Sequence, residues 1–292
     1  MVPLRRKASG FKRCSRPIKN IEHMGFRVPA LGLGTFPLQG EDRYRAELWA
    51  LEIGYRHIDT AQLYGNEADV GRAIADSGLP RDEIFLTTKC GVYDATPGAV
   101  NAELTDSLEK LQTDYVDLWM LHWPNQDTPL DETLAAMAVQ RDAGLVRVLG
   151  VGNFTVALMR EAVETHGATL FTNQFENHPF LRQPIVEQVA RDLGLSITAH
   201  SPLGRGKVPG NPVLDGIGAK YGKSAVQVAI RWQLDKDGVF LVPKSTRREG
   251  MAENFDVFDF VLDDDDRFAI EGLPNNQRGS RPSFEPDWDP VI

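Results

Sequence analysis

The chain has 292 residues, of which 42% are apolar and 25% charged, so it can bury the core of one large domain or two ordinary ones. Residues 1–20 hold seven Lys or Arg and no acid, which leaves the remainder with a net charge of −16 and argues against nucleic acid as a partner. No apolar run reaches the roughly 18 residues of a membrane span, and two cysteines are typical of a reducing compartment. We expect a cytoplasmic protein that binds neither nucleic acid nor a membrane.

The basic segment 1–20 lacks the continuous apolar core of a secretory signal. We favour a disordered extension, with an import peptide or a contact to an anionic surface as the alternative. Residues 21–292 are expected to form one domain. It begins with a predicted hairpin over Ile21–Pro29, which turns at Met24-Gly25.

The glycines of the run Ala30–Phe36 match no phosphate-binding pattern. Gly32 and Gly34 do not complete a dinucleotide fingerprint, because no third glycine follows at the right spacing. We therefore expect them to allow close packing of the backbone.

Strand-like segments then alternate with helix-like segments to the end of the chain. Helical stripes run from Tyr44, Leu48 and Leu51 to the helix predicted over Met251–Phe258. Eight strand–helix units without a linker predict a single (β/α)8 TIM barrel. A doubly wound sheet is the alternative, but its first turn would carry a glycine-rich phosphate loop. After Ala30–Phe36, the expected strands are Arg56–Thr60, Ile84–Lys89, Val116–His122, Val146–Val151, Thr169–Thr172, Ser196–Ala199 and Val239–Val242.

Polar side chains lie just past the carboxyl ends of seven expected strands. In a barrel these ends converge on one face, where active sites are built. A set of this size is better explained by a site than by isolated buried polar residues. The seven are Asp59, Lys89, His122, Asn153, Gln174, His200 and Lys244.

Two chemistries compete for this face. In the first, hydride transfer, Tyr64 donates a proton, Lys89 and Asp59 tune its pKa, and His122 orients a carbonyl oxygen. The second is a metal site built from His122 and Asp59 with Glu176 or His178. Asp59 is the only acid among the strand-end residues and no HExxH occurs, so we expect no metal.

Hydride transfer requires a cofactor, because no side chain supplies a hydride. The amides of Asn153 and Gln174 can pair with a nicotinamide carboxamide. A basic cluster at the start of the last predicted helix is well placed for phosphate, although a solvated helix start is an equal alternative. This cluster comprises Lys244, Ser245, Arg247 and Arg248.

The chain resembles the aldo-keto reductase family over about residues 21–289, most of all its bacterial 2,5-diketo-D-gluconate reductase branch. Several motifs carry the resemblance together. They are Leu31-Gly-Leu-Gly-Thr-Phe36, Gly54-Tyr-Arg-His-Ile-Asp-Thr-Ala61, Tyr64-Gly-Asn-Glu67, Thr87-Thr-Lys89, Leu121-His-Trp-Pro124, Gly150-Val-Gly-Asn-Phe154, Asn173-Gln174, Ser201-Pro-Leu-Gly204 and Pro243-Lys-Ser245 with Ala252-Glu-Asn254.

The resemblance implies a barrel that binds NADPH in extended form, with NADH possible, and a catalytic tetrad of Asp59, Tyr64, Lys89 and His122. In this reading Lys89 and Asp59 depress the pKa of Tyr64. Phe36 and Trp123 match aromatic residues of the substrate pocket, which Tyr64 and His122 share. The implied cofactor-binding residues are Thr35, Asp59, Asn153, Gln174, His200, Ser201, Leu203, Lys244, Ser245, Arg247, Glu253 and Asn254.

Four positions depart from the family pattern. Gly152 replaces a serine near the carboxamide, and His200 replaces an aromatic ring that stacks on the nicotinamide. Gly250 replaces an arginine near the 2′-phosphate, for which Arg247 and Arg248 are the candidates to compensate. Gly91 stands where a pocket tryptophan is usual, which suggests a roomier wall.

We therefore predict an NADPH-dependent oxidoreductase that reduces small aldehydes and ketones, of 2-oxoaldehyde or keto-sugar type, to alcohols. A small carbonyl compound is the expected partner, and the expected state is a monomer. The altered cofactor contacts leave one alternative, a non-catalytic subunit of the same fold that senses nicotinamide nucleotides.

Overall fold

Eight parallel strands form the centre of the structure, a computed structural model that describes residues 18–37 and 42–291. Their order in the sheet follows the order of the chain, from β3 to β10. The strands are buried, as expected for a parallel sheet covered by helices. They are β3 Leu33–Gly34, β4 His57–Asp59, β5 Phe85–Cys90, β6 Val116–Leu121, β7 Val146–Gly152, β8 Thr172–Glu176, β9 Ser196–His200 and β10 Val239–Leu241.

Backbone hydrogen bonds between the segment around β3 and the segment around β10 close the sheet into a barrel. The N–H of Gly32 donates to the carbonyl of Leu241 at 2.7 Å, and that of Gly34 donates to the carbonyl of Pro243 at 3.0 Å. A Cβ on Gly34 would lie only 2.5 Å from the carbonyl oxygen of Val242. The barrel prediction and the packing role of these glycines are therefore confirmed.

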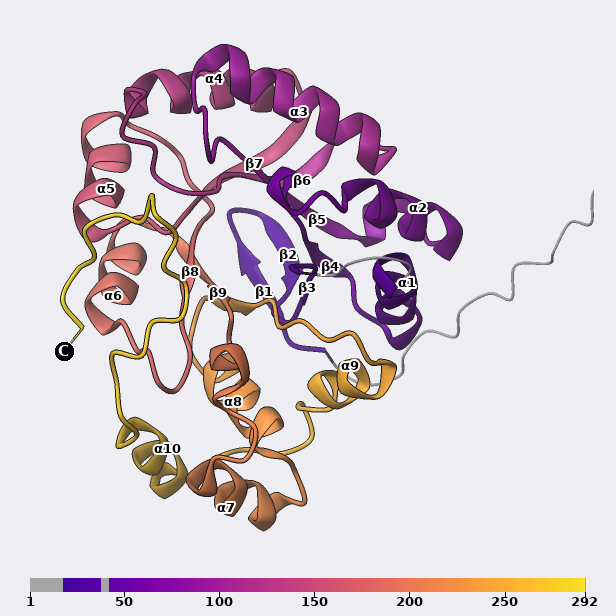
Figure 1. Cartoon of the computed structure of the whole chain (residues 1–292), viewed down its shortest axis with the longest axis vertical. Coiled ribbons are helices and arrows are strands. Elements are labelled where there is room, and N and C mark those ends of the chain that lie inside the picture. Colours follow the sequence, from indigo (N-terminus) through magenta and orange to yellow (C-terminus); the bar gives the residue numbers. More distant parts are fainter. Residues whose placement is uncertain (1–17, 38–41, 292) are drawn as a thin grey trace, which may run out of the picture.

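Helices surround the strands on the outside of the barrel (Figure 1). Side-chain caps start several of them: Thr155 accepts from the N–H of Leu158, and Ser224 forms a capping box with Gln227. Between β4 and α2 lies the short turn η1, Gln62–Tyr64. The helices are α1 Asp42–Ile53, α2 Glu67–Ser77, α3 Pro97–Leu111, α4 Leu130–Asp142, α5 Val156–Arg160, α6 Pro184–Asp192, α7 Pro212–Tyr221, α8 Ala225–Leu234, α9 Arg248–Phe255 and α10 Asp264–Glu271.

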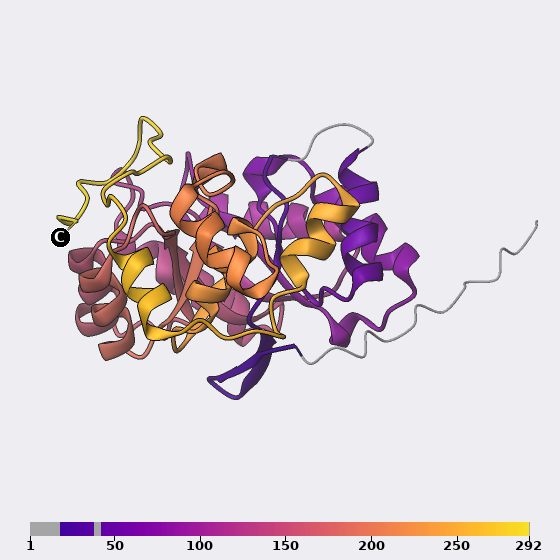
Figure 2. The same ribbon diagram turned by 90° about the horizontal axis from the view of Figure 1, so that it is seen from below.

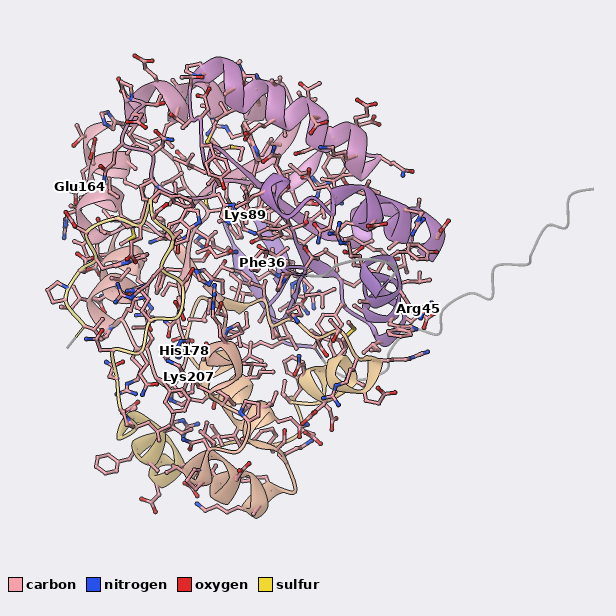
Figure 3. The ribbon with its side chains drawn as sticks, in the orientation of Figure 1. Phe36, Arg45, Lys89, Glu164, His178 and Lys207 are labelled. Carbon is pink, nitrogen blue, oxygen red and sulfur yellow. The ribbon has the colours of Figure 1, made fainter. Side chains whose placement is uncertain are left out.

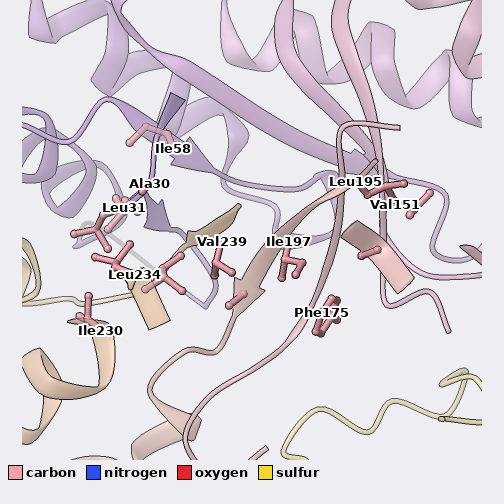
Figure 4. Packing of buried hydrophobic residues seen from close by; sticks show 14 of the residues in the cluster. Ala30, Leu31, Ile58, Val151, Phe175, Leu195, Ile197, Ile230, Leu234 and Val239 are labelled. Carbon is pink, nitrogen blue, oxygen red and sulfur yellow. The ribbon is translucent and has the colours of Figure 1, made fainter. Parts of the chain in front are cut away.

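Two hydrophobic clusters hold these layers together. The larger cluster lies between strands and helices and includes Ile58, Val151 and Ile197 (Figure 4). The smaller cluster includes the stacked rings of Phe171 and Phe240, whose centroids are 5.9 Å apart. Burial of apolar area in these clusters is the main stabilising contribution to the fold.

The predicted hairpin is confirmed as β1 Asn20–His23 paired with β2 Phe26–Pro29. Val28 belongs to the smaller cluster, and the hairpin lies at one end of the barrel, opposite the carboxyl-terminal loop (Figure 2). The hairpin therefore covers the end of the barrel at which the strands begin. The end at which the strands finish is left open for a functional site.

Some predicted boundaries are wrong. The sequence placed a strand at Thr169–Thr172, but β8 spans Thr172–Glu176, so Gln174 lies within the strand and not past its end. Leu170 and Phe171, which the sequence placed in the strand, precede it. They are apolar because they pack in the larger and the smaller hydrophobic cluster, respectively. The last predicted helix begins at Arg248, and α7 and α10 were not predicted. Most of the predicted extension 1–20 lies outside the described residues.

Candidate active site

Lys89 lies at the centre of a buried polar cluster near the carboxyl ends of the strands (Figure 3). Its ammonium donates to Oδ1 of Asp59 at 2.5 Å and to the carbonyl of Thr60 at 2.8 Å. The second carboxylate oxygen of Asp59 accepts from the amide of Gln174 at 2.8 Å. Because buried charges are tolerated only when they are paired and hydrogen-bonded, these contacts fix the position of both ions.

Tyr64 brings a phenol to the same cluster. It ends the turn η1, and Gly65 follows it in the left-handed conformation, with φ of 62°. The Tyr64 hydroxyl lies 3.4 Å from Nζ of Lys89 and 3.5 Å from Nε2 of His122. The ring of Phe36 packs against the phenol with centroids 5.0 Å apart. The fold thus brings together the four residues that the sequence proposed as a tetrad.

The protonation state of Tyr64 differs from the expectation. Burial raises its pKa above the ordinary value, Lys89 lowers it in part, and Asp59 raises it. Desolvation disfavours the charged phenolate, and the neighbouring cation offsets only part of that cost. Tyr64 therefore keeps its proton at neutral pH, which is the form that a proton donor requires.

Lys89 carries a positive charge, whereas His122 is neutral. Burial lowers the pKa of Lys89, but Asp59 and Tyr64 raise it more, so the ammonium persists. Burial lowers the pKa of His122 well below its usual range, and Lys89 adds to that shift. A neutral imidazole carries one N–H, and Nδ1 of His122 has no hydrogen-bond partner. His122 can thus donate one hydrogen bond without changing the charge of the site.

Asn153 connects two of the polar strand ends. Its amide nitrogen donates to the backbone carbonyl of His122 at 3.1 Å, and its Oδ1 lies 3.1 Å from Nε2 of His200. Burial lowers the pKa of His200 to about 4, so the ring is neutral. Next to Asn153, a Cβ on Gly152 would lie 2.4 Å from the carbonyl oxygen of His122. This close approach explains why glycine, and not serine, occupies the position.

A cavity of about 760 Å³ opens above the cluster. Six of the seven strand-end residues line it, and Lys89 lies beneath it, bonded to Asp59. The predicted pocket residues Phe36, Tyr64, His122 and Trp123 also line it, whereas Gly91 is buried and is not among its lining residues. Of the predicted cofactor-binding residues, the cavity is lined by Thr35, Asp59, Asn153, Gln174, His200, Ser201, Leu203 and Lys244.

The remaining predicted cofactor-binding residues, Ser245, Arg247, Glu253 and Asn254, lie on the connection after β10 and on α9. The two arginines there differ. Arg248 forms an ion pair with Glu52 of α1 at 3.0 Å, so its charge is already engaged. A Cβ on Gly250 would lie 2.6 Å from Oγ of Ser245, so the glycine allows this turn to fold tightly.

The carboxyl-terminal loop forms a wall of the cavity that the sequence analysis did not identify. Phe284 packs edge-on against Trp123 with centroids 5.6 Å apart. The aromatic residues of the tail are a signal that the tail packs on the domain, but no spacing rule shows which residues they contact. The lining residues missed from the sequence are Gly34, Pro37, Leu63, Pro202, Arg205, Gly206, Pro209, Val242, Pro243, Gly279, Ser280, Arg281, Pro282 and Phe284.

Glu176, a candidate metal ligand by its residue type, holds this loop instead. Its carboxylate accepts from the N–H groups of Gly279 at 2.9 Å and Ser280 at 2.8 Å, and lies 3.1 Å from Nε2 of His178. Burial raises the pKa of Glu176, but these hydrogen bonds, and the charge that His200 carries only below its own pKa of about 4, lower it more, to about 2. Within residues 18–37 and 42–291 no three His, Cys, Asp or Glu side chains form a group suited to a metal ion.

The barrel and the cluster at its open end together define an oxidoreductase that reduces carbonyl groups. Residues 30–274 match the aldo/keto reductase family. The chain belongs to this family and is an aldo-keto reductase enzyme, so the alternative of a non-catalytic nucleotide-sensing subunit is not supported. In the described part of the chain, no helix has the length and apolarity needed to cross a membrane.

Individual relatives agree with this assignment. The chain is 40% identical to methylglyoxal reductase DkgB of Escherichia coli O157:H7 over 266 residues, which is 90% of this chain and 99% of the relative. A crystal structure of a putative 2,5-diketo-D-gluconic acid reductase B superposes with a TM-score of 0.91 at 43% identity, covering 94% of this chain and 98% of its own. The Bombyx mori aldo-keto reductase in complex with NADP has a TM-score of 0.83 at 32% identity, with 90% and 95% of the two chains covered.

Proposed function

We propose that this aldo-keto reductase uses NADPH to reduce small aldehydes and ketones, of 2-oxoaldehyde or keto-sugar type, with Tyr64 as the proton donor. The observation that carries the proposal is the position of the Tyr64 hydroxyl, 3.4 Å from the ammonium of Lys89 and open to the cavity. The names of the Escherichia coli and 2,5-diketo-D-gluconic acid relatives support the substrate class. The NADP complex of the Bombyx mori relative supports the cofactor.

The polar groups of the cavity fit a nicotinamide cofactor. Oγ1 of Thr35 is buried at the cavity wall and has no hydrogen-bond partner. Gln174 uses its amide nitrogen for Asp59, so its Oε1 can accept from a carboxamide. Lys244 and Arg247 supply positive charge for phosphate groups. Because Arg247 supplies positive charge for the additional 2′-phosphate, we propose NADPH as the preferred cofactor and NADH as the second one.

The residues of the cluster then have separate roles. When bound, the nicotinamide supplies a hydride to the carbonyl carbon of the substrate. The neutral His122 donates a hydrogen bond to the carbonyl oxygen and fixes its position. Tyr64 gives its proton to that oxygen, and the resulting phenolate is stabilised by Lys89, which Asp59 holds in place.

A phenylalanine at position 64 tests the role of the hydroxyl. Tyr64→Phe keeps the ring that packs against Phe36 and removes the proton, so kcat should fall by about 10²- to 10⁴-fold. NADPH binding, measured by fluorescence titration, should persist. Tyr115→Phe is the matched control, because Tyr115 lies between Arg81 and Arg147 and does not line the cavity. Unchanged turnover in Tyr64→Phe would exclude Tyr64 as the proton donor.

We further propose that the enzyme is a cytoplasmic monomer. The absence of a disulfide framework among its two cysteines supports a reducing compartment. The cluster and the cavity are assembled from one chain, so the proposed reaction requires no second subunit. Size-exclusion chromatography with light scattering would measure the state directly.

A further inference from the structure

His200 connects two residues whose backbones are strained. Asn153 and Ser201 are not glycines, yet their φ angles are 62° and 50°. Non-glycine residues in this left-handed region are uncommon, and they concentrate at functional sites. The imidazole of His200 contacts both side chains, with Nε2 3.1 Å from Oδ1 of Asn153 and Nδ1 3.2 Å from Oγ of Ser201. The ring therefore links the residue that follows β7 to the residue that follows β9.

The contacts of Asn153 determine which nitrogen of His200 carries the hydrogen. The amide nitrogen of Asn153 donates to the carbonyl of His122, so its Oδ1 faces His200 and can only accept. The reverse orientation of the amide would set Oδ1 against that carbonyl. Nε2 of the neutral ring is therefore the donor, and Nδ1 accepts from the hydroxyl of Ser201. With a partner at each nitrogen, the ring has one tautomer and one orientation.

The hydrogen bond from His200 also orients the second N–H of the Asn153 amide. An amide carries two N–H donors; Asn153 uses one for His122, and no described residue accepts the other. The backbone N–H of Asn153 donates to the carbonyl of Gln174 at 2.7 Å, so the two residues are neighbours at the cavity wall. A donor from Asn153 and the acceptor Oε1 of Gln174 match the carbonyl and the N–H₂ of one carboxamide, in a single orientation.

We propose that His200 is a positioning residue for the nicotinamide: its Nε2–H holds the Asn153 amide that binds the carboxamide. This role differs from that of the stacking aromatic ring that the family resemblance implies at this position. It depends on a hydrogen-bond donor at residue 200 and not on a flat ring. The proposal rests on the proposed function, because it assumes that a nicotinamide cofactor binds in this cavity.

Three substitutions separate a hydrogen bond from a stacked ring. His200→Gln removes the ring but keeps an N–H donor about where Nε2 lies, within reach of Asn153. His200→Asn carries the same amide on a side chain one methylene shorter, so its amide lies near the position of Nδ1 and does not reach Asn153. His200→Phe keeps a ring and loses both nitrogens. The asparagine variant is the matched control for the glutamine variant, because the two differ only in reach.

Isothermal titration calorimetry with NADPH measures the effect. The Kd should rise about 10-fold in His200→Phe and in His200→Asn, because each leaves the buried Oδ1 of Asn153 without its donor. In His200→Gln the Kd should rise by less than about 3-fold, since the donor is restored. The reference ligand is 2′-phospho-ADP-ribose, which carries the phosphates of NADPH but no nicotinamide. For this ligand the three variants should differ from one another by less than about 2-fold.

Four binding results would overturn the proposal. Affinity for NADPH that is kept by His200→Phe and lost by both amide variants would assign His200 to stacking. An equal loss in His200→Gln and His200→Asn would show that the donor does not matter. Equal losses for NADPH and 2′-phospho-ADP-ribose would mean that His200 supports the turn after β9 and not the carboxamide. Wild-type affinity in all three variants would leave His200 without a role in binding.

Turnover of phenylglyoxal, a 2-oxoaldehyde, distinguishes failure of this inference from failure of the proposed function. If wild type reduced phenylglyoxal with neither NADPH nor NADH, the proposed function would fail and this inference with it. If wild type reduced it and the variants gave any of the four binding results above, only this inference would be refuted.

Discussion

Replacing Glu176 by glutamine should release the carboxyl-terminal loop from the barrel. The carboxylate is 1% exposed and accepts from two backbone N–H groups of the loop, at Gly279 and Ser280. Its pKa falls from 4.5 to about 2 on folding, and a shift of that size corresponds to about 3 kcal/mol of stability at pH 7. A glutamine presents one N–H₂ group to these donors and keeps only one accepting oxygen. We therefore expect a loss of about 3 kcal/mol for Glu176→Gln at pH 7.

The pH dependence separates this ionic contribution from simple loss of packing. A lowered folded-state pKa gives stability that is present above the unfolded value of 4.5 and is lost as the pH falls toward 2. Urea unfolding should thus show a difference between wild type and Glu176→Gln of about 3 kcal/mol at pH 7 and about 2 kcal/mol at pH 3.5. Glu164→Gln, on the outer surface (Figure 3), should cost less than about 1 kcal/mol at either pH. A difference that does not change with pH would refute the reasoning.

The remaining predictions concern the reaction and the cofactor. Because His122 titrates well below its usual range and Tyr64 above its own, kcat/KM for reduction should stay flat from about pH 5 to 8 and decline only in alkali. An inflection near the ordinary histidine pKa of about 6.5 would contradict these charge states. Arg247→Gln should weaken NADPH binding about 10-fold and leave NADH unchanged, whereas Arg248→Gln, already paired with Glu52, should change either by less than about 3-fold. Fluorescence titration with NADPH and with NADH measures these affinities. An equal loss of NADPH affinity in the two variants would show that Arg247 is not the specific partner of the 2′-phosphate.

The sequence predicted the barrel and most of one face of its site. Asp59, Lys89 and His122 each lie at or next to the carboxyl end of a strand, so local patterns and the geometry of parallel strands were sufficient to place them together. The loop from Gly279 was not predicted, because it reaches the cavity through contacts between distant segments, which no periodicity encodes.

The direction in which the pKa of Tyr64 shifts could not be predicted from the sequence either. A lysine and an aspartate near a phenol suggest a lowered value, and motif spacing gives no measure of how completely the phenol is dehydrated. The same holds for Arg248, whose ion pair with Glu52 depends on how α9 packs beside α1. Charge type is readable from the sequence, but solvation and pairing are properties of the packed structure.

The hydrogen bond from Gln174 to Asp59 has a consequence for how such an enzyme can change. It links β8 to β4 across the mouth of the barrel, while Asp59 also holds Lys89 of β5. The groups proposed to act in the reaction thereby connect three strands that are not all neighbours in the sheet. Many enzymes gain stability when an active-site residue is replaced. Here the replacement of Asp59 or Lys89 would leave its buried partner unpaired. A substitution that abolishes the proposed reaction should therefore also lower the stability of the protein.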